Sequence, residues 1–149
     1  MATALFAGSF NPFTIGHASV VERALPLFDR IIIAVGVNPD KCVLADDADE
    51  NIKEIKKFCK RFPEGKVEVT AYGGELTVEL AKRLGADCLL RGVRSVKDFE
   101  YERDLADINR RIAGIETMLI FSLPEHSAIS SSMVRELSSY GIDTKAFLP

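Results

Sequence analysis

The run Ile31-Ile32-Ile33-Ala34-Val35 consists of apolar residues, all but Ala34 β-branched. It shows none of the polar alternation of a strand that faces water on one side. Such a run is typical of a central strand of a parallel sheet, because both faces of that strand are buried. We expect the strand to span residues 30–37, with Asn38-Pro39-Asp40 forming the turn that follows it.

Apolar stretches and amphipathic stretches alternate on both sides of this run. Repeated alternation of this kind predicts right-handed βαβ units and an α/β fold with a doubly wound, five-stranded parallel sheet. The length of 149 residues fits one domain, residues 1–149. Pro26 should disturb the end of the first helix. The expected strands are 2–7, 30–37, 66–72, 87–91 and 116–123, and the expected helices are 15–28, 48–62, 75–84, 98–112 and 130–139.

Charge and composition exclude several classes of protein. The net charge of −3 creates no overall electrostatic attraction for nucleic acid or an anionic membrane. No apolar stretch is long enough to span a bilayer. The N-terminus lacks the basic region of a signal peptide. Cys42, Cys59 and Cys88 are odd in number and lack C-x-x-C spacing, and His17 and His126 are the only histidines. We therefore expect reduced thiols, a cytoplasmic location and no protein-bound metal.

The segment after the first strand is Gly8-Ser9-Phe10-Asn11-Pro12-Phe13-Thr14-Ile15-Gly16-His17. Gly8 allows the backbone to approach a ligand, and Ser9 supplies a hydroxyl. Gly16 and His17 open the next helix, where free N–H groups and the helix dipole favour phosphate. The alternative is an ordinary Gly/Pro turn with a capping histidine, which helix-end statistics alone favour.

Phosphate-binding groups also follow three other predicted strands. Lys41 follows the second strand, where the alternative is a solvated surface lysine. Arg91-Gly92-Val93-Arg94 follows the fourth strand and can hold phosphates bidentately, unless these arginines pair with Asp98 and Glu100 on the surface. Residues 124–135 follow the fifth strand and carry three consecutive serines, Ser130 to Ser132, of which a simple helix cap needs only one.

The expected meeting of these four strand ends favours the phosphate-binding interpretation over the ordinary turn, cap and surface interpretations. In a doubly wound sheet, ligands bind outside the carboxyl ends of the strands, at the point where strand order reverses. Four independent coincidences at four strand ends are much less probable than one. The sequence has no Walker loop, no G-x-G-x-x-G and no catalytic triad order. The available groups suit positioning and charge neutralisation, which nucleotidyl or phosphoryl transfer requires.

The same segments carry a family resemblance. Thr14-Ile15-Gly16-His17 resembles the T/H-x-G-H signature of the nucleotidyltransferase superfamily, and Ile129-Ser130-Ser131-Ser132-Met133-Val134-Arg135 resembles its I-S-S-[ST]-x-x-[RK] signature. The stretch Arg91 to Glu102, R-G-V-R-S-V-K-D-F-E-Y-E, is similar to the bacterial phosphopantetheine adenylyltransferase family. The resemblance covers nearly the whole chain and implies a Rossmann-like nucleotidyltransferase domain.

This resemblance implies that AMP passes from ATP to 4′-phosphopantetheine by direct in-line attack. The products are dephospho-coenzyme A and pyrophosphate. It also implies Mg²⁺ as cofactor, a homohexamer as a dimer of trimers, and coenzyme A as a further candidate ligand. The implied catalytic residues are His17, Lys41 and Arg91. The implied ATP-binding residues are Ser9, Phe10, His17, Gly92, Val93, Arg94, Glu102, His126, Ser127, Ala128, Ile129, Ser130, Ser131 and Ser132, and the implied acceptor-binding residues are Ser9, Lys41, Thr77, Arg91 and Asn109.

Two alternatives remain open on the sequence. One keeps the superfamily and changes the acceptor, for example to nicotinamide mononucleotide or glycerol phosphate. The other is a nucleotide-binding sensor or scaffold without catalysis. Its support is Asn11, where the family usually has Asp, and the acidic stretch Asp46 to Asn51, a loop that we expect to gate or weaken substrate entry.

Overall fold

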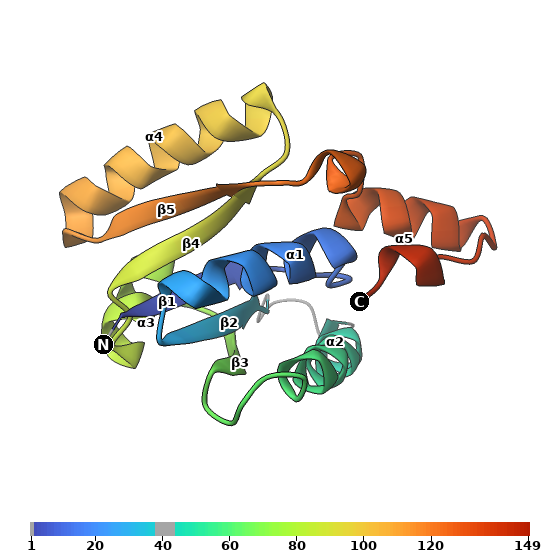
Figure 1. Ribbon diagram of the computed structural model, residues 1–149, viewed down its shortest axis with the longest axis horizontal. Coiled ribbons are helices and arrows are strands. Elements are labelled where there is room, and N and C mark those ends of the chain that lie inside the picture. Colours follow the sequence, from blue (N-terminus) through green and yellow to red (C-terminus); the bar gives the residue numbers. More distant parts are fainter. Residues whose placement is uncertain (1, 38–43) are drawn as a thin grey trace.

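The computed structural model describes residues 2–37 and 44–149, and it confirms the predicted α/β fold (Figure 1). Five parallel strands form one sheet in the order β3-β2-β1-β4-β5. The strands are β1 (Thr3–Gly8), β2 (Arg30–Gly36), β3 (Val67–Tyr72), β4 (Cys88–Val93) and β5 (Glu116–Phe121). The helices are α1 (Ile15–Ala24), α2 (Leu44–Cys59), α3 (Thr77–Leu84), α4 (Val96–Ala113) and α5 (Ser131–Ser139), with short 3₁₀ turns η1 (Leu25–Leu27), η2 (Pro124–His126) and η3 (Lys145–Phe147).

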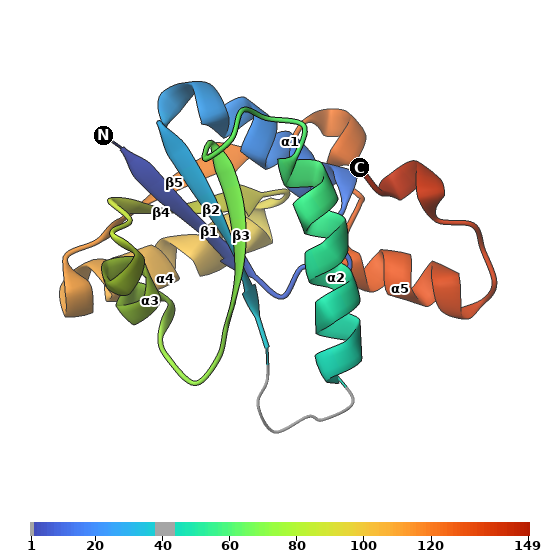
Figure 2. The ribbon, with the colours of Figure 1, turned by 90° about the horizontal axis from the view of Figure 1, so that it is seen from below.

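The central strands bury both faces, which explains their uninterrupted apolar runs. Phe6, Ile31 and Ile33 belong to the core on one face, together with residues of α1 and α2. Leu5 and Ile32 belong to the core on the other face, together with residues of α3. Figure 2 shows α2 on one side of the sheet and α3 and α4 on the other.

All five helices differ from their predicted bounds, three of them by no more than two residues at either end and two by more. The helix expected over 15–28 ends at Ala24, and Pro26 lies in the 3₁₀ turn η1 because proline disrupts an α-helix interior. The helix expected over 48–62 begins at Leu44, so the predicted acidic loop lies within α2. Acidic residues are favoured near a helix N-terminus, and this preference outweighs the missing apolar periodicity.

The order of the strands reverses between β1 and β4. β1 pairs with β2 along its whole length, from Thr3 to Gly8, but it pairs with β4 only through Ala4 and Leu5. The two strands therefore lose their ladder toward their carboxyl ends, which leaves room for a crevice there. Helix α5 lies beyond this edge of the sheet (Figures 1 and 2). No helix among the described ranges is long and apolar enough to cross a membrane.

Candidate functional site

A cavity of about 370 Å³ opens where β1 and β4 separate, next to the N-termini of α1 and α5. We call it the polar cavity. It brings together predicted residues from three strand ends. This agrees with the rule, called here the switch-point rule, that ligands bind where the strand order reverses. The predicted residues that line it are Ser9, Phe10, His17, Arg91, Gly92, Val93, Arg94, His126, Ile129, Ser130, Ser131 and Ser132.

The loop between β1 and α1 is shaped around the Phe10 ring. Phe10 is buried and has a positive φ of 44°, a conformation that bulky residues rarely adopt. Its ring packs edge-on against Phe6 at 4.9 Å and against His17 at 5.0 Å between centroids. A Cβ on Gly8 would lie 3.1 Å from this ring, so a glycine here lets Phe10 close over the strand end.

Two helices hold this loop from outside. Asn51 of α2 donates to the carbonyl of Phe10 and, at 3.3 Å, to that of Ser9. From α5, the Ser131 hydroxyl donates to the carbonyl of Pro12 at 2.8 Å, and Arg135 donates to the carbonyl of Asn11. Because these bonds all go to backbone carbonyls, they fix the path of the loop independently of its side chains.

His17 combines the two interpretations that the sequence left open, since it caps a helix and also lines the polar cavity. Its Nδ1 accepts from the backbone N–H of Thr14 at 2.9 Å, while the Thr14 hydroxyl accepts from the N–H of His17. Nδ1 therefore carries no hydrogen in the neutral ring, and Nε2 is the donor. Burial, followed by the nearby charges of Arg94 and Arg91, lowers the pKa of His17 from 6.5 to about 4.

Arg91 extends from β4 to the gap in the ladder. Its Nη1 donates to the carbonyl of Ala7 at 2.5 Å, which joins the two strands where their backbone pairing has ended. Its Nε and Nη2 bind the carboxylate of Glu102, at 2.6 Å for the shortest contact. Glu102 is only 5% exposed, and it does not line the polar cavity.

Arg94 pairs with Asp98, one of the two surface partners that the sequence suggested for it, at 3.6 Å. It still lines the polar cavity. Between the two arginines, a Cβ on Gly92 would lie 3.0 Å from a methyl group of Val20. Glycine therefore permits the close contact between β4 and α1 that forms this wall.

The start of α5 supplies hydroxyls and free N–H groups. Ser130 is the N-cap and accepts from the N–H of Met133 at 3.1 Å. Its hydroxyl also lies 3.2 Å from that of Ser132. His126, in the preceding turn, has a buried Nδ1 that finds no hydrogen-bond partner within residues 2–37 and 44–149. This end of the cavity thus offers a ligand the N-terminus of α5, the Ser132 hydroxyl and Nδ1 of His126.

A second cavity, of about 210 Å³, lies under α3 and α4, and we call it the helix-side cavity. It contains the predicted acceptor residues Thr77, Arg91 and Asn109, together with Glu102. Arg91, Ala7 and Gly8 line both this cavity and the polar cavity, so the two meet at the strand ends. The lining residues that sequence reasoning missed are Ala7, Tyr72, Leu89, Tyr101, Leu105 and Thr117.

A third cavity, of about 510 Å³, is open and mainly apolar, and we call it the apolar cavity. Val96, Phe99 and Phe121 form its apolar walls, with Val96 and Phe121 more than half exposed. It shares Val93, Arg94 and Ser122 with the polar cavity. The predicted residue Ser127 lies here.

The remaining predictions have different outcomes. Lys41 lies outside the described residues. Ala128 lines none of these three cavities. Arg135 lines the polar cavity and was part of the quoted motif, so the motif could have identified it. Asn51 carried no signal, because its role depends on contacts between distant segments. Within the described ranges, no group of three or more His, Cys, Asp or Glu side chains could hold a metal ion.

The fold and this site define a nucleotidyltransferase. The chain belongs to the cytidylyltransferase-like family, whose model matches residues 5–137. Within that class it belongs to the phosphopantetheine adenylyltransferases. It is 46% identical over 149 residues to the Bacteroides fragilis phosphopantetheine adenylyltransferase, covering 100% of this chain and 97% of that one. It is 49% identical over 146 residues to the Porphyromonas gingivalis phosphopantetheine adenylyltransferase, covering 98% of this chain and 93% of that one.

Solved structures with low sequence identity show the same fold. A bifunctional NMN adenylyltransferase/ADP ribose pyrophosphatase from Francisella tularensis, complexed with AMP and a manganese ion, superposes with a TM-score of 0.70. The match covers 99% of this chain and 44% of that one, at 13% identity. The doubly wound sheet is thus shared by adenylyltransferases whose sequences have diverged widely.

Proposed function

We propose that this protein transfers AMP from ATP to 4′-phosphopantetheine, giving dephospho-coenzyme A and pyrophosphate in coenzyme A biosynthesis. The observation that carries the proposal is the position of Arg91, which lines the polar cavity and the helix-side cavity at once. A transfer between two phosphates needs cationic donors where the two substrates meet. Membership of the phosphopantetheine adenylyltransferase family supports this choice of substrates.

The polar cavity suits the triphosphate of ATP. The N-termini of α1 and α5 present free N–H groups, and Ser130 and Ser132 add hydroxyls. Its lining, as far as the described part of the chain forms it, includes Arg94 and Arg135 but no carboxylate. The apolar cavity adjoins it through Val93 and Arg94 and suits the adenine ring.

The helix-side cavity suits the pantetheine arm. The arm carries amide groups, and Thr77 and Asn109 supply polar partners, while Leu105 and Tyr101 supply apolar contact. With its phosphate at Arg91, the acceptor would extend away from the nucleotide. The rigid end of the acceptor is then held by charge, and its flexible arm is held by side chains of α3 and α4.

In the proposed reaction a phosphate oxygen of the acceptor attacks the α-phosphorus of ATP. The new P–O bond forms as the bond to the departing pyrophosphate breaks. The attacking phosphate is already an anion, so no general base is needed. His17 is neutral near pH 7 and its Nδ1 is occupied by Thr14, so it acts as an Nε2–H donor to the charge that develops in the transition state.

We propose that Mg²⁺ accompanies ATP as part of the substrate. Mg²⁺ is commonly held by substrate phosphates with few protein ligands. Among the residues that the structure describes, the polar cavity is lined by hydroxyls and cations and by no carboxylate, and these residues do not fit a resident metal. Titrating Mg²⁺ into EDTA-treated, metal-free protein, with and without ATP, tests this. Mg²⁺ binding should require ATP.

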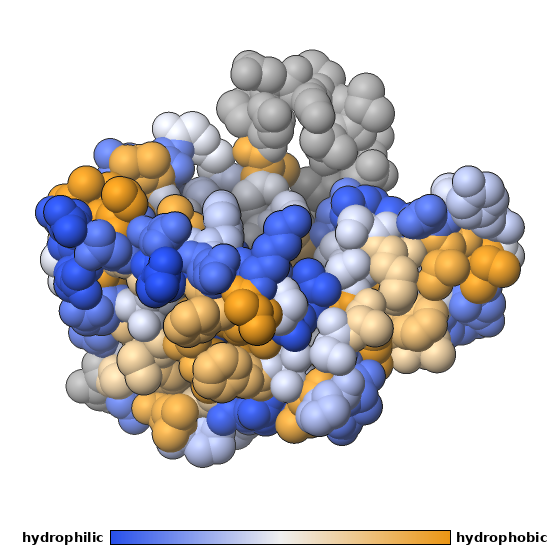
Figure 3. Space-filling model, turned by 90° about the horizontal axis from the view of Figure 1, so that it is seen from above, coloured by the Kyte–Doolittle hydropathy of each residue, from blue (hydrophilic) through white to orange (hydrophobic). Residues whose placement is uncertain are grey.

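We propose further that the protein is a homohexamer in the cytoplasm. β5 is an edge strand, and large apolar side chains are exposed along it and along α4, among them Met118, Phe121, Ile108 and Ile112. Apolar residues lie among the charged ones on this side of the molecule (Figure 3). Light scattering tests the hexamer. The free thiols of Cys59 and Cys88 are consistent with a reducing compartment, and cell fractionation tests the location.

Pyrophosphate release from ATP and Mg²⁺, with and without 4′-phosphopantetheine, tests the function. We expect release only with the acceptor and dephospho-coenzyme A as the product. Release with nicotinamide mononucleotide or glycerol phosphate instead would assign a different acceptor. ATP binding without release with any acceptor would identify a nucleotide sensor and contradict the proposal.

A further inference from the structure

The carboxamide of Asn51 on α2 binds the backbone of the loop between β1 and α1. Its Nδ2 lies 3.3 Å from the carbonyl oxygen of Ser9 and also contacts the carbonyl oxygen of Phe10. A carbonyl oxygen only accepts hydrogen bonds, so the atom that faces both of them must be the donor nitrogen. The two hydrogens on this nitrogen match the two oxygens, and the contact joins parts of the chain that are 41 residues apart.

Phe10 is the residue of this loop whose conformation most needs support. Its φ of 44° lies in the left-handed region, which costs a bulky residue free energy and persists only where surrounding contacts hold it. Its ring is held by packing, including the edge-on contact with His17 at 5.0 Å. The bonds from α5 reach the loop farther along, at the carbonyls of Asn11 and Pro12. Asn51 therefore holds the backbone of the strained residue itself.

The same contact sets the direction of an N–H group that can bind a ligand. The peptide bond between Ser9 and Phe10 is trans, so its carbonyl and its N–H point in opposite directions. Because the carbonyl is turned toward Asn51, the N–H of Phe10 points away from α2. Within residues 2–37 and 44–149 this N–H finds no acceptor. Ser9 and Phe10 line the polar cavity whereas Asn51 does not, so the N–H is directed to the cavity side of the loop.

We propose that Asn51 is a positioning residue for ATP, acting through the backbone of Ser9 and Phe10 rather than by contact with the nucleotide. The inference rests on the proposed function, because it takes the polar cavity as the ATP site. A backbone donor favours a bound phosphate most when its direction is fixed before the ligand arrives. Asn51 fixes this direction from outside the cavity.

The chemistry of the side chain at this position fits the role. Asn51 follows Asp49 and Glu50 in the sequence, yet it is itself a neutral amide. A carboxylate in its place would have no hydrogen to donate and would face two carbonyl oxygens, which would repel it. The position thus discriminates between two side chains of nearly equal size, and this difference provides the test.

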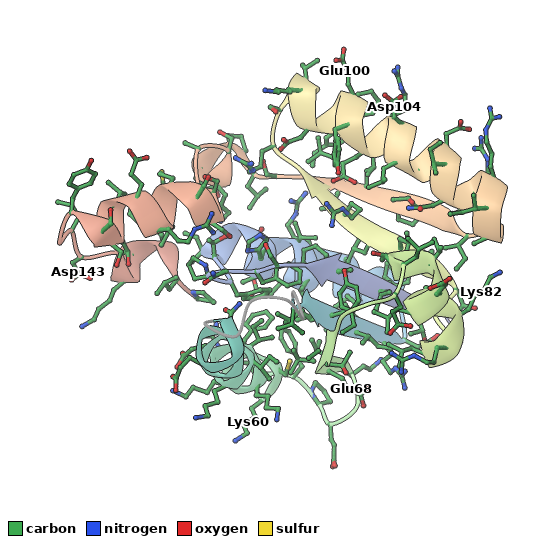
Figure 4. All side chains as sticks on the ribbon, turned by 180° about the vertical axis from the view of Figure 1, so that it is seen from behind. Lys60, Glu68, Lys82, Glu100, Asp104 and Asp143 are labelled. Carbon is green, nitrogen blue, oxygen red and sulfur yellow. The ribbon has the colours of Figure 1, made fainter. Side chains whose placement is uncertain are left out.

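The first test compares Asn51→Ala and Asn51→Asp with Lys60→Ala. Lys60 directly follows α2, and its side chain points away from the sheet (Figure 4). For Asn51→Ala we expect kcat/KM for ATP to fall roughly 5- to 30-fold, which corresponds to one or two hydrogen bonds. KM for 4′-phosphopantetheine should stay within about twofold. Asn51→Asp, assayed at pH 8, should lower kcat/KM for ATP further than Asn51→Ala, and Lys60→Ala should leave both values unchanged.

The second test is rescue by Asn51→Gln, which keeps the carboxamide on a side chain one methylene longer. This variant should retain a higher kcat/KM for ATP than Asn51→Ala, because it can still donate to the two carbonyls. All assays are made at a temperature at which thermal unfolding curves show every variant to be folded. If Asn51→Asp does not fold, the comparison of Asn51→Gln with Asn51→Ala takes its place with the same readouts.

Three results would overturn the inference while leaving the proposed function intact. Wild-type kinetics for Asn51→Asp would show that Asn51 only fills space. An equal loss in Lys60→Ala would assign the effect to α2 as a whole, and a parallel rise in KM for 4′-phosphopantetheine would show that the effect is not specific to ATP. Absence of acceptor-dependent pyrophosphate release in the wild-type protein would instead refute the proposed function, and with it this inference.

Discussion

The polar cavity and the helix-side cavity meet at Arg91 but are built in different ways. The polar cavity uses groups that also hold the fold together, such as the helix caps at Thr14 and Ser130. The helix-side cavity uses side chains such as Thr77 and Asn109, which project from helices that would form without them. Replacing the capping groups of the polar cavity should therefore affect stability and substrate handling together, whereas replacing Thr77 or Asn109 should affect acceptor binding alone.

His17→Ala should give the largest effect, because it removes a donor to the transition state. We expect kcat to fall roughly 100- to 1,000-fold, with the Kd of ATP changed by no more than a few-fold. Steady-state kinetics and calorimetry measure the two quantities. The variant also leaves the N–H of Thr14 without its acceptor, so thermal unfolding should show a loss of about 1 kcal/mol. Unchanged turnover would remove His17 from the mechanism.

The same residue should make the free energy of unfolding depend on pH. The pKa of His17 is about 4 in the folded protein and near 6.5 when unfolded. Between these values the unfolded chain binds a proton and the folded chain does not, so stability falls as pH falls from 6.5 toward 4 and is fully present above 6.5. Between pH 7 and pH 5 we expect a loss of about 2 kcal/mol.

Urea unfolding at both pH values, with His17→Asn as the comparison, measures this contribution. Asn has no ionisation in this range, so the variant should lose about 2 kcal/mol less than the wild type between pH 7 and pH 5. Equal losses in the two proteins would show that His17 accepts a proton as readily when folded as when unfolded.

The two cavities also differ in how far the sequence predicts them. The polar cavity follows from local patterns, because a short apolar strand, a glycine and a helix start occur together at Gly8 and again near Gly92. The switch-point rule then places these ends side by side. The sequence did not predict the start of α2, because Leu44 to Glu50 lacks apolar periodicity. The catalytic role of Lys41 remains a prediction.

Contacts between distant segments explain what the sequence could not predict. Glu102 was assigned to ATP by resemblance, and only the packing of α4 against β4 shows it bound to Arg91. Tyr72 and Thr117 reach the helix-side cavity from β3 and β5, strands on opposite edges of the sheet. The spacing of these residues along the chain does not predict that their side chains line the same cavity.

Asn109→Ala tests the helix-side cavity by itself. Losing one amide partner of the acceptor should raise KM for 4′-phosphopantetheine about 5- to 10-fold, which corresponds to one hydrogen bond. KM for ATP and the melting temperature should stay at wild-type values, as they should in Asp104→Asn on the same helix. A parallel rise in KM for ATP would mean that the two cavities do not bind separate substrates.

Ser130→Ala and Ser132→Ala should give the smallest effects and separate folding from binding within the polar cavity. Both hydroxyls line it, but only Ser130 caps α5. Ser130→Ala should lower the free energy of unfolding by about 1 kcal/mol, while Ser132→Ala should leave it nearly unchanged. Both should raise KM for ATP by about two- to fivefold, through loss of one exposed hydrogen bond each. If Ser132→Ala destabilises the protein as much as Ser130→Ala, the cap is shared between the two hydroxyls, which lie 3.2 Å apart.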